Sequence, residues 1–290
     1  MLNRMDYFSA IILGIVQGLT EFLPVSSSAH IRVSTDLLGI GDPGSGFTAI
    51  IQIGTEIAVL IYFWHDIVEI LTKWWRSLPW IKVNRIPSSD PHVRLGWMII
   101  VGSLPIGIFG LLLEDWIDSS FRNLWITVFT LAFFGLLLGV ADIYGRRERS
   151  LEQMTWLQAI LYGLAQALAL IPGVSRSGGT ITAGRLMGFT RPAAARYSFL
   201  LAMPAIFASG LYKTYDVFTG PEGAAVAWGP TLVATLVCFV VGYAVIVWFL
   251  KLVSTRSFMP FVIYRVALAA AIAVLLLADV LHADAIAVAL

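Results

Sequence analysis

Residues 10–31 read AIILGIVQGLTEFLPVSSSAHI, and this stretch decides how the rest of the chain is interpreted. An apolar run over 8–23 stops at a proline, three consecutive serines and a histidine. A helix that crosses a bilayer needs about 20 mostly apolar residues. A shorter run that ends at a polar break is therefore typical of a segment that enters the membrane and turns back. A second run, 157–171, ends in the same way at PGVSRSGGT.

The two stretches are copies of one another. An offset of 149 positions aligns 10–31 with 159–180 without a gap, and eight of the 22 aligned positions are identical. The identical pairs are Ala10/Ala159, Ile11/Ile160, Gly14/Gly163, Gln17/Gln166, Leu19/Leu168, Val25/Val174, Ser26/Ser175 and Ser28/Ser177. Unrelated segments of average composition would share about one or two. The sequence therefore predicts one integral membrane domain over 1–290, with internal repeats at about 1–149 and 150–290.

Composition independently indicates a membrane protein. Of the 290 residues, 58% are hydrophobic and 13% are charged, whereas soluble globular chains carry about 25% charged residues. The 19 basic and 18 acidic residues leave a net charge of +1, so no basic surface is available for nucleic acid. Cys238 is the only cysteine, which excludes a disulfide framework and a cysteine-based metal site. These features exclude an ordinary soluble enzyme.

Six further stretches are long and apolar enough to be expected to cross a bilayer. They are 47–64, 95–113, 124–141, 197–215, 229–250 and 261–281. Each half of the chain then consists of a re-entrant helical hairpin followed by three transmembrane helices. Because three crossings are an odd number, the second half is expected to lie upside down relative to the first. The expected fold class is an all-α polytopic membrane protein with an inverted-topology repeat.

The charges of the connecting segments predict the orientation. The 66–94 loop and the loop after Ala141 are basic, whereas the 114–123 loop between them is net acidic. The positive-inside rule places basic loops in the cytoplasm. The first hairpin is then expected to enter from the extracytoplasmic side and the second from the cytoplasm, with both termini outside. The basic residues that follow the second hairpin are Arg185, Arg191 and Arg196.

The first break carries a carboxylate, three hydroxyls and an imidazole. Glu21 lies in an apolar segment, where an ionisable group costs about 2.5–3.5 kcal/mol on insertion scales. Gln17 is four residues earlier and therefore on the same helix face. The polar residues that follow are Ser26, Ser27, Ser28 and His30. A structural carboxylate and serines that cap the next helix are the alternative, but the combination favours a chemical role.

Every polar side chain of the second break can donate a hydrogen bond, and the break is therefore expected to bind an anion. Its glycines allow backbone N–H groups to converge, and the start of a following helix adds a positive dipole. Arg176 offers a planar fork that matches phosphate oxygens. The candidate diphosphate-binding residues are Gly173, Ser175, Ser177, Gly178 and Thr180, with Gln17, Ser26 and Ser28 from the first break. The alternative is a flexible turn whose arginine extends to the membrane interface.

The two copies differ where their polar residues matter most. Leu170 stands at the position equivalent to Glu21, and Ser27 stands at the position equivalent to Arg176. One hairpin thus supplies acid, base and hydroxyls, and the other supplies a cationic anion site. If the hairpins meet, the sequence predicts a single polar pocket with apolar walls, suited to an amphiphile with a phosphate head and a lipid tail.

The motifs at 17–30 and 172–180 resemble the two signature motifs of the undecaprenyl-diphosphatases, bacterial membrane phosphatases associated with bacitracin resistance. Similarity at 47–59, 198–204 and 258–265 extends the resemblance over essentially the whole chain. It implies hydrolysis of undecaprenyl diphosphate to undecaprenyl phosphate and inorganic phosphate, which recycles the lipid carrier of peptidoglycan synthesis. It also implies a multi-pass protein of the bacterial inner (plasma) membrane, a site open to the extracytoplasmic side, and a divalent cation, Mg²⁺ or Ca²⁺.

By this resemblance, the catalytic roles fall on Glu21, Ser27, His30 and Arg176. The acidic pair of the family falls on Glu21 and Gln17, which are the expected metal-binding residues, although Gln17 would contribute a hydrogen bond and no charge. The attacking group remains open between Ser27, His30 and water. Glu56 lies in the 47–64 span, and its expected role is open between structural pairing and metal binding.

Two other functions are compatible with parts of this pattern. A polyprenyl-phosphate transporter or flippase would use inverted repeats and an anion pocket, but transport gives less reason for Glu21, Ser27 and His30 beside a phosphate site. A purely structural or drug-resistance subunit would leave the buried charges unexplained. The expected partners are a polyprenyl diphosphate lipid and membrane lipids, with no nucleic acid. A homodimer is also compatible with the sequence.

Overall fold

The computed structural model describes residues 5–40, 44–113, 123–145, 148–219 and 226–284. In these ranges the secondary structure is helical, apart from an isolated bridge between Arg149 and Phe189. The first half contains α1 (Tyr7–Thr20), α2 (Ser27–Leu37), α3 (Gly44–Tyr62), α4 (Trp64–Ser77), α5 (Pro91–Leu112) and α7 (Leu124–Tyr144). The second contains η1 (Leu151–Gln153), α8 (Trp156–Ala167), η2 (Leu168–Leu170), α9 (Arg176–Leu186), α10 (Arg191–Thr219), α11 (Trp228–Thr255) and α12 (Met259–Leu277).

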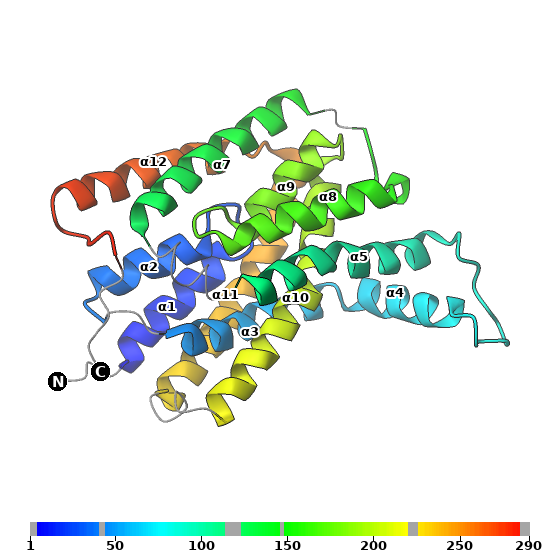
Figure 1. Ribbon diagram of the computed structural model, residues 1–290, viewed down its shortest axis with the longest axis horizontal. Helices are drawn as coiled ribbons and strands as arrows, with labels where there is room; N and C mark the ends of the chain where they lie inside the picture. The colour runs from blue at the N-terminus through cyan, green and yellow to red at the C-terminus, as the bar shows by residue number, and fades with distance from the viewer. Residues whose placement is uncertain (1–4, 41–43, 114–122, 146–147, 220–225, 285–290) are drawn as a thin grey trace.

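Within the described ranges, five helices are long and apolar enough to cross a membrane by themselves, namely α5, α7, α10, α11 and α12. A sixth span is formed if α3 and α4 are counted together, although this pair is bent by 77° at Phe63. All six expected spans therefore coincide with helices, and the expectation of an all-α polytopic membrane protein is confirmed. Figure 1 shows α7 and α12 side by side along one edge, and α4 and α5 side by side at the far end.

The prediction of a loop over 66–94 is wrong for much of this segment, because α4 continues to Ser77 and α5 already begins at Pro91. Apolar residues of α4 recur at helical spacing, and Ile70 is buried against α5. Gly96 of α5 leaves room for Trp74, whose side chain lies 3.2 Å from where a Cβ would be. The segments at 114–122 and 146–147, which also served as evidence for orientation, lie outside the described residues.

Both short apolar helices stop where the sequence predicts a break. α1 ends shortly before Pro24, which has no N–H and disfavours helical geometry in the residue before it. Ser26 then takes a left-handed φ of 72°, and α2 begins at the next residue. Ser175 has the same geometry, with φ 68°, immediately before α9. The chain therefore turns at both breaks through a serine in the left-handed region.

Arg265 of α12 joins the two breaks in the interior. Its side chain is fully buried, and its guanidinium donates to the carbonyl oxygens of Pro24 (3.2 Å), Gly173 (2.8 Å) and Val174 (3.0 Å). It also donates to the carbonyls of Leu131 and Thr130 in α7. One buried cation thus fixes two segments that are far apart in the sequence, because its guanidinium pairs buried carbonyls of both breaks.

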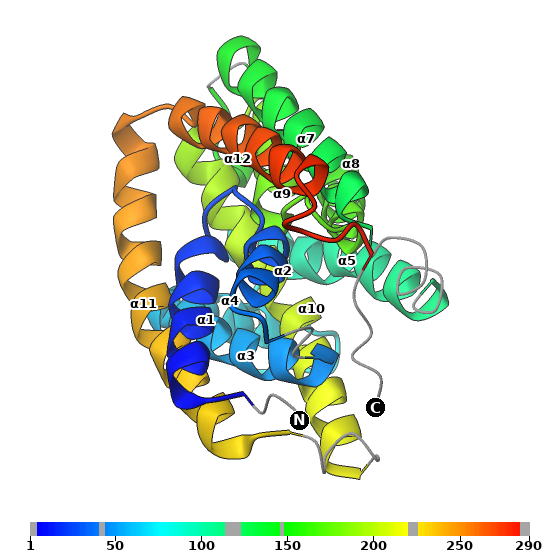
Figure 2. The ribbon, with the colours of Figure 1, turned by 90° about the vertical axis from the view of Figure 1, so that its left-hand side faces the viewer.

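Glycines allow the helices that carry the site to pack closely on α11. A Cβ at Gly14 of α1 would lie 2.5 Å from the carbonyl oxygen of Ala234, and one at Gly54 of α3 would overlap the carbonyl oxygen of Thr235. Small residues permit such close backbone approach between membrane helices. Figure 2 shows α11 along the side of the molecule, next to α1 and α3. α11 is therefore the common support for both helices.

The arginines behind the second hairpin are not simple loop charges. Arg185 is fully buried in α9 and donates to a carboxylate oxygen of Asp142 (3.3 Å) and to the carbonyl of Phe189 (2.5 Å). Arg191 binds the same carboxylate through two nitrogens, at 2.7 and 2.9 Å. Arg185 and Arg191 therefore belong to a buried ion-pair network and are not charges of a connecting loop. Asp142 and its arginines connect α7, α9 and α10 instead.

Candidate active site

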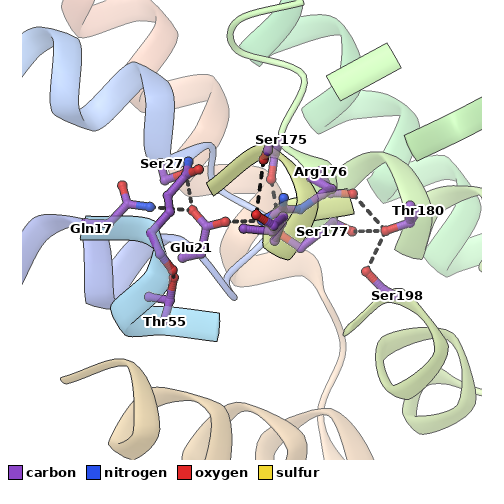
Figure 3. Close-up of polar contacts among 12 residues, drawn as sticks. Gln17, Glu21, Ser27, Thr55, Ser175, Arg176, Ser177, Thr180 and Ser198 are labelled. Atoms are coloured by element: carbon purple, nitrogen blue, oxygen red, sulfur yellow. Dashed lines mark hydrogen bonds and ion pairs between the residues drawn. The ribbon is translucent and has the colours of Figure 1, made fainter. Parts of the chain in front are cut away.

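Glu21 is the centre of a polar cluster that joins the two breaks. Its Oε2 accepts hydrogen bonds from Gln17 Nε2 and from Ser27 Oγ, both at 2.7 Å. Its Oε1 forms an ion pair with Arg176. Figure 3 shows these four side chains converging from three helices. The carboxylate is 4% exposed. Water therefore competes little for its hydrogen bonds and its ion pair, which are stronger than they would be at a surface.

Local structure explains why these residues meet. Gln17 and Glu21 are one helical turn apart at the end of α1, so their side chains are neighbours. Ser27 and Arg176 are the first residues of α2 and α9. The first N–H groups of a helix lack intrahelical acceptors and carry a partial positive charge. Two helix N-termini and a guanidinium are therefore directed at one place, which suits a polyanion.

His30 lies near this cluster but makes different contacts. Its Nδ1 lies 2.7 Å from the carbonyl oxygen of Ser26, and its Nε2 lies 2.7 Å from the hydroxyl of Tyr264. Because a carbonyl only accepts, Nδ1 donates to Ser26, and in the neutral imidazole Nε2 then accepts from Tyr264. Ser27 instead donates to Glu21. The structure thus pairs the candidate nucleophile with the carboxylate and holds the imidazole with a tyrosine.

The remaining serines mainly hold the two breaks in place. Ser26 and Ser28 hydroxyls pair at 3.1 Å, and those of Ser175 and Ser177 pair at 3.2 Å. Ser177 also donates to the carbonyl of Leu23 at 2.9 Å, which links the second break to the first. Ser28 is exposed, whereas Ser26, Ser175 and Ser177 are buried. Ser177 also lines the cavity described below.

Three predicted diphosphate-binding residues have structural contacts in this conformation. Thr180 is fully buried and bonds the carbonyl of Arg176 (2.7 Å) and the hydroxyl of Ser198 (2.5 Å). The N–H of Gly178 donates to Ser175 Oγ at 3.1 Å. Gly173 has φ 90° and lies against α7, where a Cβ would overlap the Thr130 hydroxyl. These residues shape the loop that presents Arg176.

A small cavity lies beside the Glu21–Arg176 pair. Its lining residues are Glu21, Phe22, Glu56, Val59, Arg176, Ser177, Ser198, Phe199 and Ala202. The polar residues come from both breaks, α3 and α10, and the remaining lining residues are apolar. This is the arrangement that the comparison of the two hairpins predicts, a polar pocket walled by apolar helices.

Three residues of this region were missed or left unassigned by the sequence. Glu56 is 2% exposed and shares the cavity with Glu21. A role for Arg265 could have been predicted, because a charged residue inside the apolar 261–281 span is costly unless it is paired. Tyr264 had no such signal, because its contact with His30 depends on how α12 packs beside α2.

The oxygen ligands at the site are compatible with a divalent cation. Mg²⁺ is usually bound through one or two carboxylates together with phosphate oxygens of the substrate, and Ca²⁺ also takes carboxylate and carbonyl oxygens. Glu21 and the amide oxygen of Gln17 provide such ligands at the end of α1. Among the described residues, no group of three or more histidine, cysteine, aspartate or glutamate side chains is placed to hold a metal alone. Substrate oxygens would therefore complete the coordination.

Comparisons with known proteins show which proteins the chain is similar to. A family model described as bacitracin resistance protein BacA matches residues 10–271. The chain is 59% identical over 281 residues to the undecaprenyl-diphosphatase of Micrococcus luteus, covering 96% of this chain and 100% of that protein. It is 55% identical over 286 residues to that of Arthrobacter sp. (strain FB24), covering 97% of each chain. Identity to the undecaprenyl-diphosphatase of Bifidobacterium adolescentis is 54% over 286 residues, covering 96% and 97%.

Proposed function

The chain belongs to the family of the bacitracin resistance protein BacA, and we propose that its two breaks form the active site of a lipid diphosphatase. It is a multi-pass membrane hydrolase that converts undecaprenyl diphosphate to undecaprenyl phosphate and inorganic phosphate. This reaction recycles the lipid carrier of cell-wall synthesis and confers bacitracin resistance. The observation that carries the site assignment is the contact of Glu21 with Ser27 on one side and with Arg176 on the other.

Substrate binding begins with Arg176. Its guanidinium exchanges the Glu21 carboxylate for oxygens of the diphosphate, which carry more negative charge and match its planar fork. The N-termini of α2 and α9 donate further hydrogen bonds to the same group. The lipid tail extends from this polar pocket along the apolar helices. When Arg176 binds the diphosphate, Oε1 of Glu21 loses the guanidinium with which it is paired.

The chemical step uses Ser27 as the nucleophile. Its Oγ attacks the terminal phosphorus, its proton passes to Oε2 of Glu21, and the bond from that phosphorus to the bridging oxygen breaks. Undecaprenyl phosphate leaves and takes up the proton. A water molecule then attacks the phosphoserine, inorganic phosphate leaves, and Ser27 recovers a proton. Direct attack by water, with His30 or Glu21 as the base, is the competing route, but the 2.7 Å contact from Ser27 to Glu21 favours the serine.

His30 has a positioning role in this scheme. As the neutral imidazole it donates to the carbonyl of Ser26 and accepts from Tyr264, which fixes the residue directly before Ser27. The left-handed backbone of Ser26 costs about 1–3 kcal/mol, and this hydrogen bond helps to hold it. The expected result is a nucleophile that is aligned before substrate arrives.

A divalent cation, Mg²⁺ or Ca²⁺, would be held by Glu21 with Gln17 and would neutralise charge that develops on the diphosphate. The inverted arrangement of the halves, a site open to the extracytoplasmic side of the bacterial plasma membrane, and a homodimer are further parts of the proposal. The basic and acidic connecting segments support the orientation. A flippase is less well supported, because transport alone gives no use for a serine that donates to a buried carboxylate.

Phosphate release by the purified protein tests the function directly. In detergent, with undecaprenyl diphosphate and Mg²⁺ or Ca²⁺, the protein should release inorganic phosphate without any membrane gradient. Substrate labelled at the terminal phosphate should leave label on Ser27 in a rapid-quench experiment. Phosphate release without label on the protein at any time would replace the serine route by water attack. No phosphate release at all would overturn the proposal.

A further inference from the structure

We propose that Glu56 of α3 is the second carboxylate ligand of the divalent cation and would bind it together with Glu21. This inference rests on the proposed function, because it concerns the metal used by the same site. It gives a role to a residue whose type is costly inside a membrane helix. Three observations support it, namely the position of Glu56, its missing partner, and the balance of charge in the cavity.

Position is the first observation. Glu56 is 2% exposed, in the middle of α3. It lines the same cavity as Glu21 and Arg176. Both α1 and α3 pack closely on α11, at Gly14 and Gly54 respectively, so the two carboxylates are carried by helices that share one support. A metal site requires its ligands to be held in this way.

The second observation is that Glu56 has an unsatisfied oxygen. Its Oε2 is buried and has no hydrogen-bond partner in the described part of the chain. The other buried carboxylates near the interior behave differently, since Glu21 accepts from three residues and Asp142 is bound by Arg191 and Arg185. Burial without a partner is expensive. A buried, unpaired carboxylate in a polar cavity therefore indicates a cation that binds there.

Charge balance is the third observation. Arg176 pairs with Glu21 in this conformation and is needed for the diphosphate in the proposed reaction. When it turns to the substrate, Glu21 and Glu56 are left facing a polyanion across a small cavity. Gln17 cannot supply a second negative charge, because its neutral amide donates to Glu21. One divalent cation would balance the two carboxylates and also bind phosphate oxygens.

Metal binding, measured apart from catalysis, tests this inference. Full-length protein in detergent would be titrated with Mn²⁺, and bound metal would be counted by electron paramagnetic resonance in the presence of undecaprenyl phosphate. Glu56→Gln preserves shape and removes the charge, and it should weaken Mn²⁺ binding at least about tenfold, as Glu21→Gln should. Glu152→Gln is the matched control, since Glu152 is exposed in η1, and it should bind Mn²⁺ as the unchanged protein does.

The outcomes separate this inference from the proposed function. Mn²⁺ affinity of Glu56→Gln within twofold of the unchanged protein would overturn the role of Glu56, even if phosphate release fell. If Glu56→Gln does not fold, Glu56→Asp decides, because its carboxylate is drawn back by one methylene. Weaker Mn²⁺ binding by that variant supports the inference, and unchanged binding overturns it. By contrast, unchanged protein that binds Mn²⁺ but releases no phosphate would overturn the function alone.

Discussion

Nε2 of His30 lies 2.7 Å from the hydroxyl of Tyr264, although 234 residues separate them in the sequence. The two rings are stacked, with centroids 5.6 Å apart and planes at 4°. The carbonyl of Ser26 fixes the tautomer of the neutral His30 ring by accepting from Nδ1, and the Tyr264 hydroxyl holds the remaining nitrogen. α12 thus controls the imidazole at the first break, and the next residue of α12, Arg265, binds both breaks directly.

Removing the hydroxyl of Tyr264 should lower turnover modestly. Tyr264→Phe keeps the stacked ring but loses one hydrogen bond, which is worth about 0.5–1.5 kcal/mol, or roughly two- to tenfold in rate. The melting temperature should change little. Tyr243→Phe, at an exposed tyrosine of α11, is the control and should leave kcat unchanged. Equal activity of both variants would show that Tyr264 does not position His30.

The neighbouring serines should differ sharply in their effects. Ser27 donates to Glu21, whereas Ser28 is exposed and pairs with Ser26. Ser27→Ala should reduce kcat by at least about a thousandfold, because the nucleophile is lost. Ser28→Ala should retain activity within about threefold. Steady-state phosphate release measures both, and substantial turnover by Ser27→Ala would favour attack by water.

Glu21 and Arg176 should each be indispensable for turnover but not for insertion. Glu21→Ala and Arg176→Ala should lower kcat/KM by orders of magnitude, because the first loses the proton acceptor and the second loses the diphosphate fork. Arg176→Lys keeps the charge without the fork and should mainly raise KM. Arg256→Lys, at an exposed arginine, is the control. Near-normal activity of either alanine variant would contradict the site assignment.

Arg265 should matter for stability as well as activity. Arg265→Lys cannot donate to all the carbonyls that the guanidinium now contacts, and each buried carbonyl left without a donor costs about 1–3 kcal/mol. We expect the free energy of unfolding to fall by at least about 3 kcal/mol on that basis, seen as a clearly lower melting temperature in detergent. Phosphate release should fall too, since both breaks lose a support. A melting temperature like that of the unchanged protein would argue against this role.

Close packing of α1 on α11 gives a prediction with a built-in control. A Cβ at Gly14 would lie 2.5 Å from the carbonyl oxygen of Ala234, whereas a Cβ at Gly107 of α5 meets nothing within 4 Å. Gly14→Ala should therefore destabilise the protein by about 1–3 kcal/mol through overpacking. Gly107→Ala should be neutral or slightly stabilising, because alanine favours the helix. Thermal unfolding in detergent compares the two, and equal melting temperatures would exclude a tight contact at Gly14.

Features that depend on local chain properties could be predicted well. The length of each apolar run set the expected spans, and all six coincide with helices. Pro24 and the serine-rich turn predicted the first break, because a proline interrupts a helix whatever surrounds it. The left-handed φ of Ser26 was seen only in the structure. α4 was mistaken for a loop, since its charged residues masked an apolar stripe that packs on α5.

The sequence by itself therefore determined a polytopic helical membrane protein with two polar breaks, and it identified Glu21, Ser27, His30 and Arg176 as candidates. Only the tertiary structure decided which of them touch. In the structure, Glu21 contacts Ser27 and Arg176, whereas His30 is hydrogen-bonded to Tyr264. Glu56 and Arg265 lie in the same region. The physical reason is that hydropathy and turn chemistry act over a few residues. The contacts between residues 155 or 234 positions apart depend on how the helices pack. The sequence does not determine that packing, because a polar side chain in a span has many alternative partners.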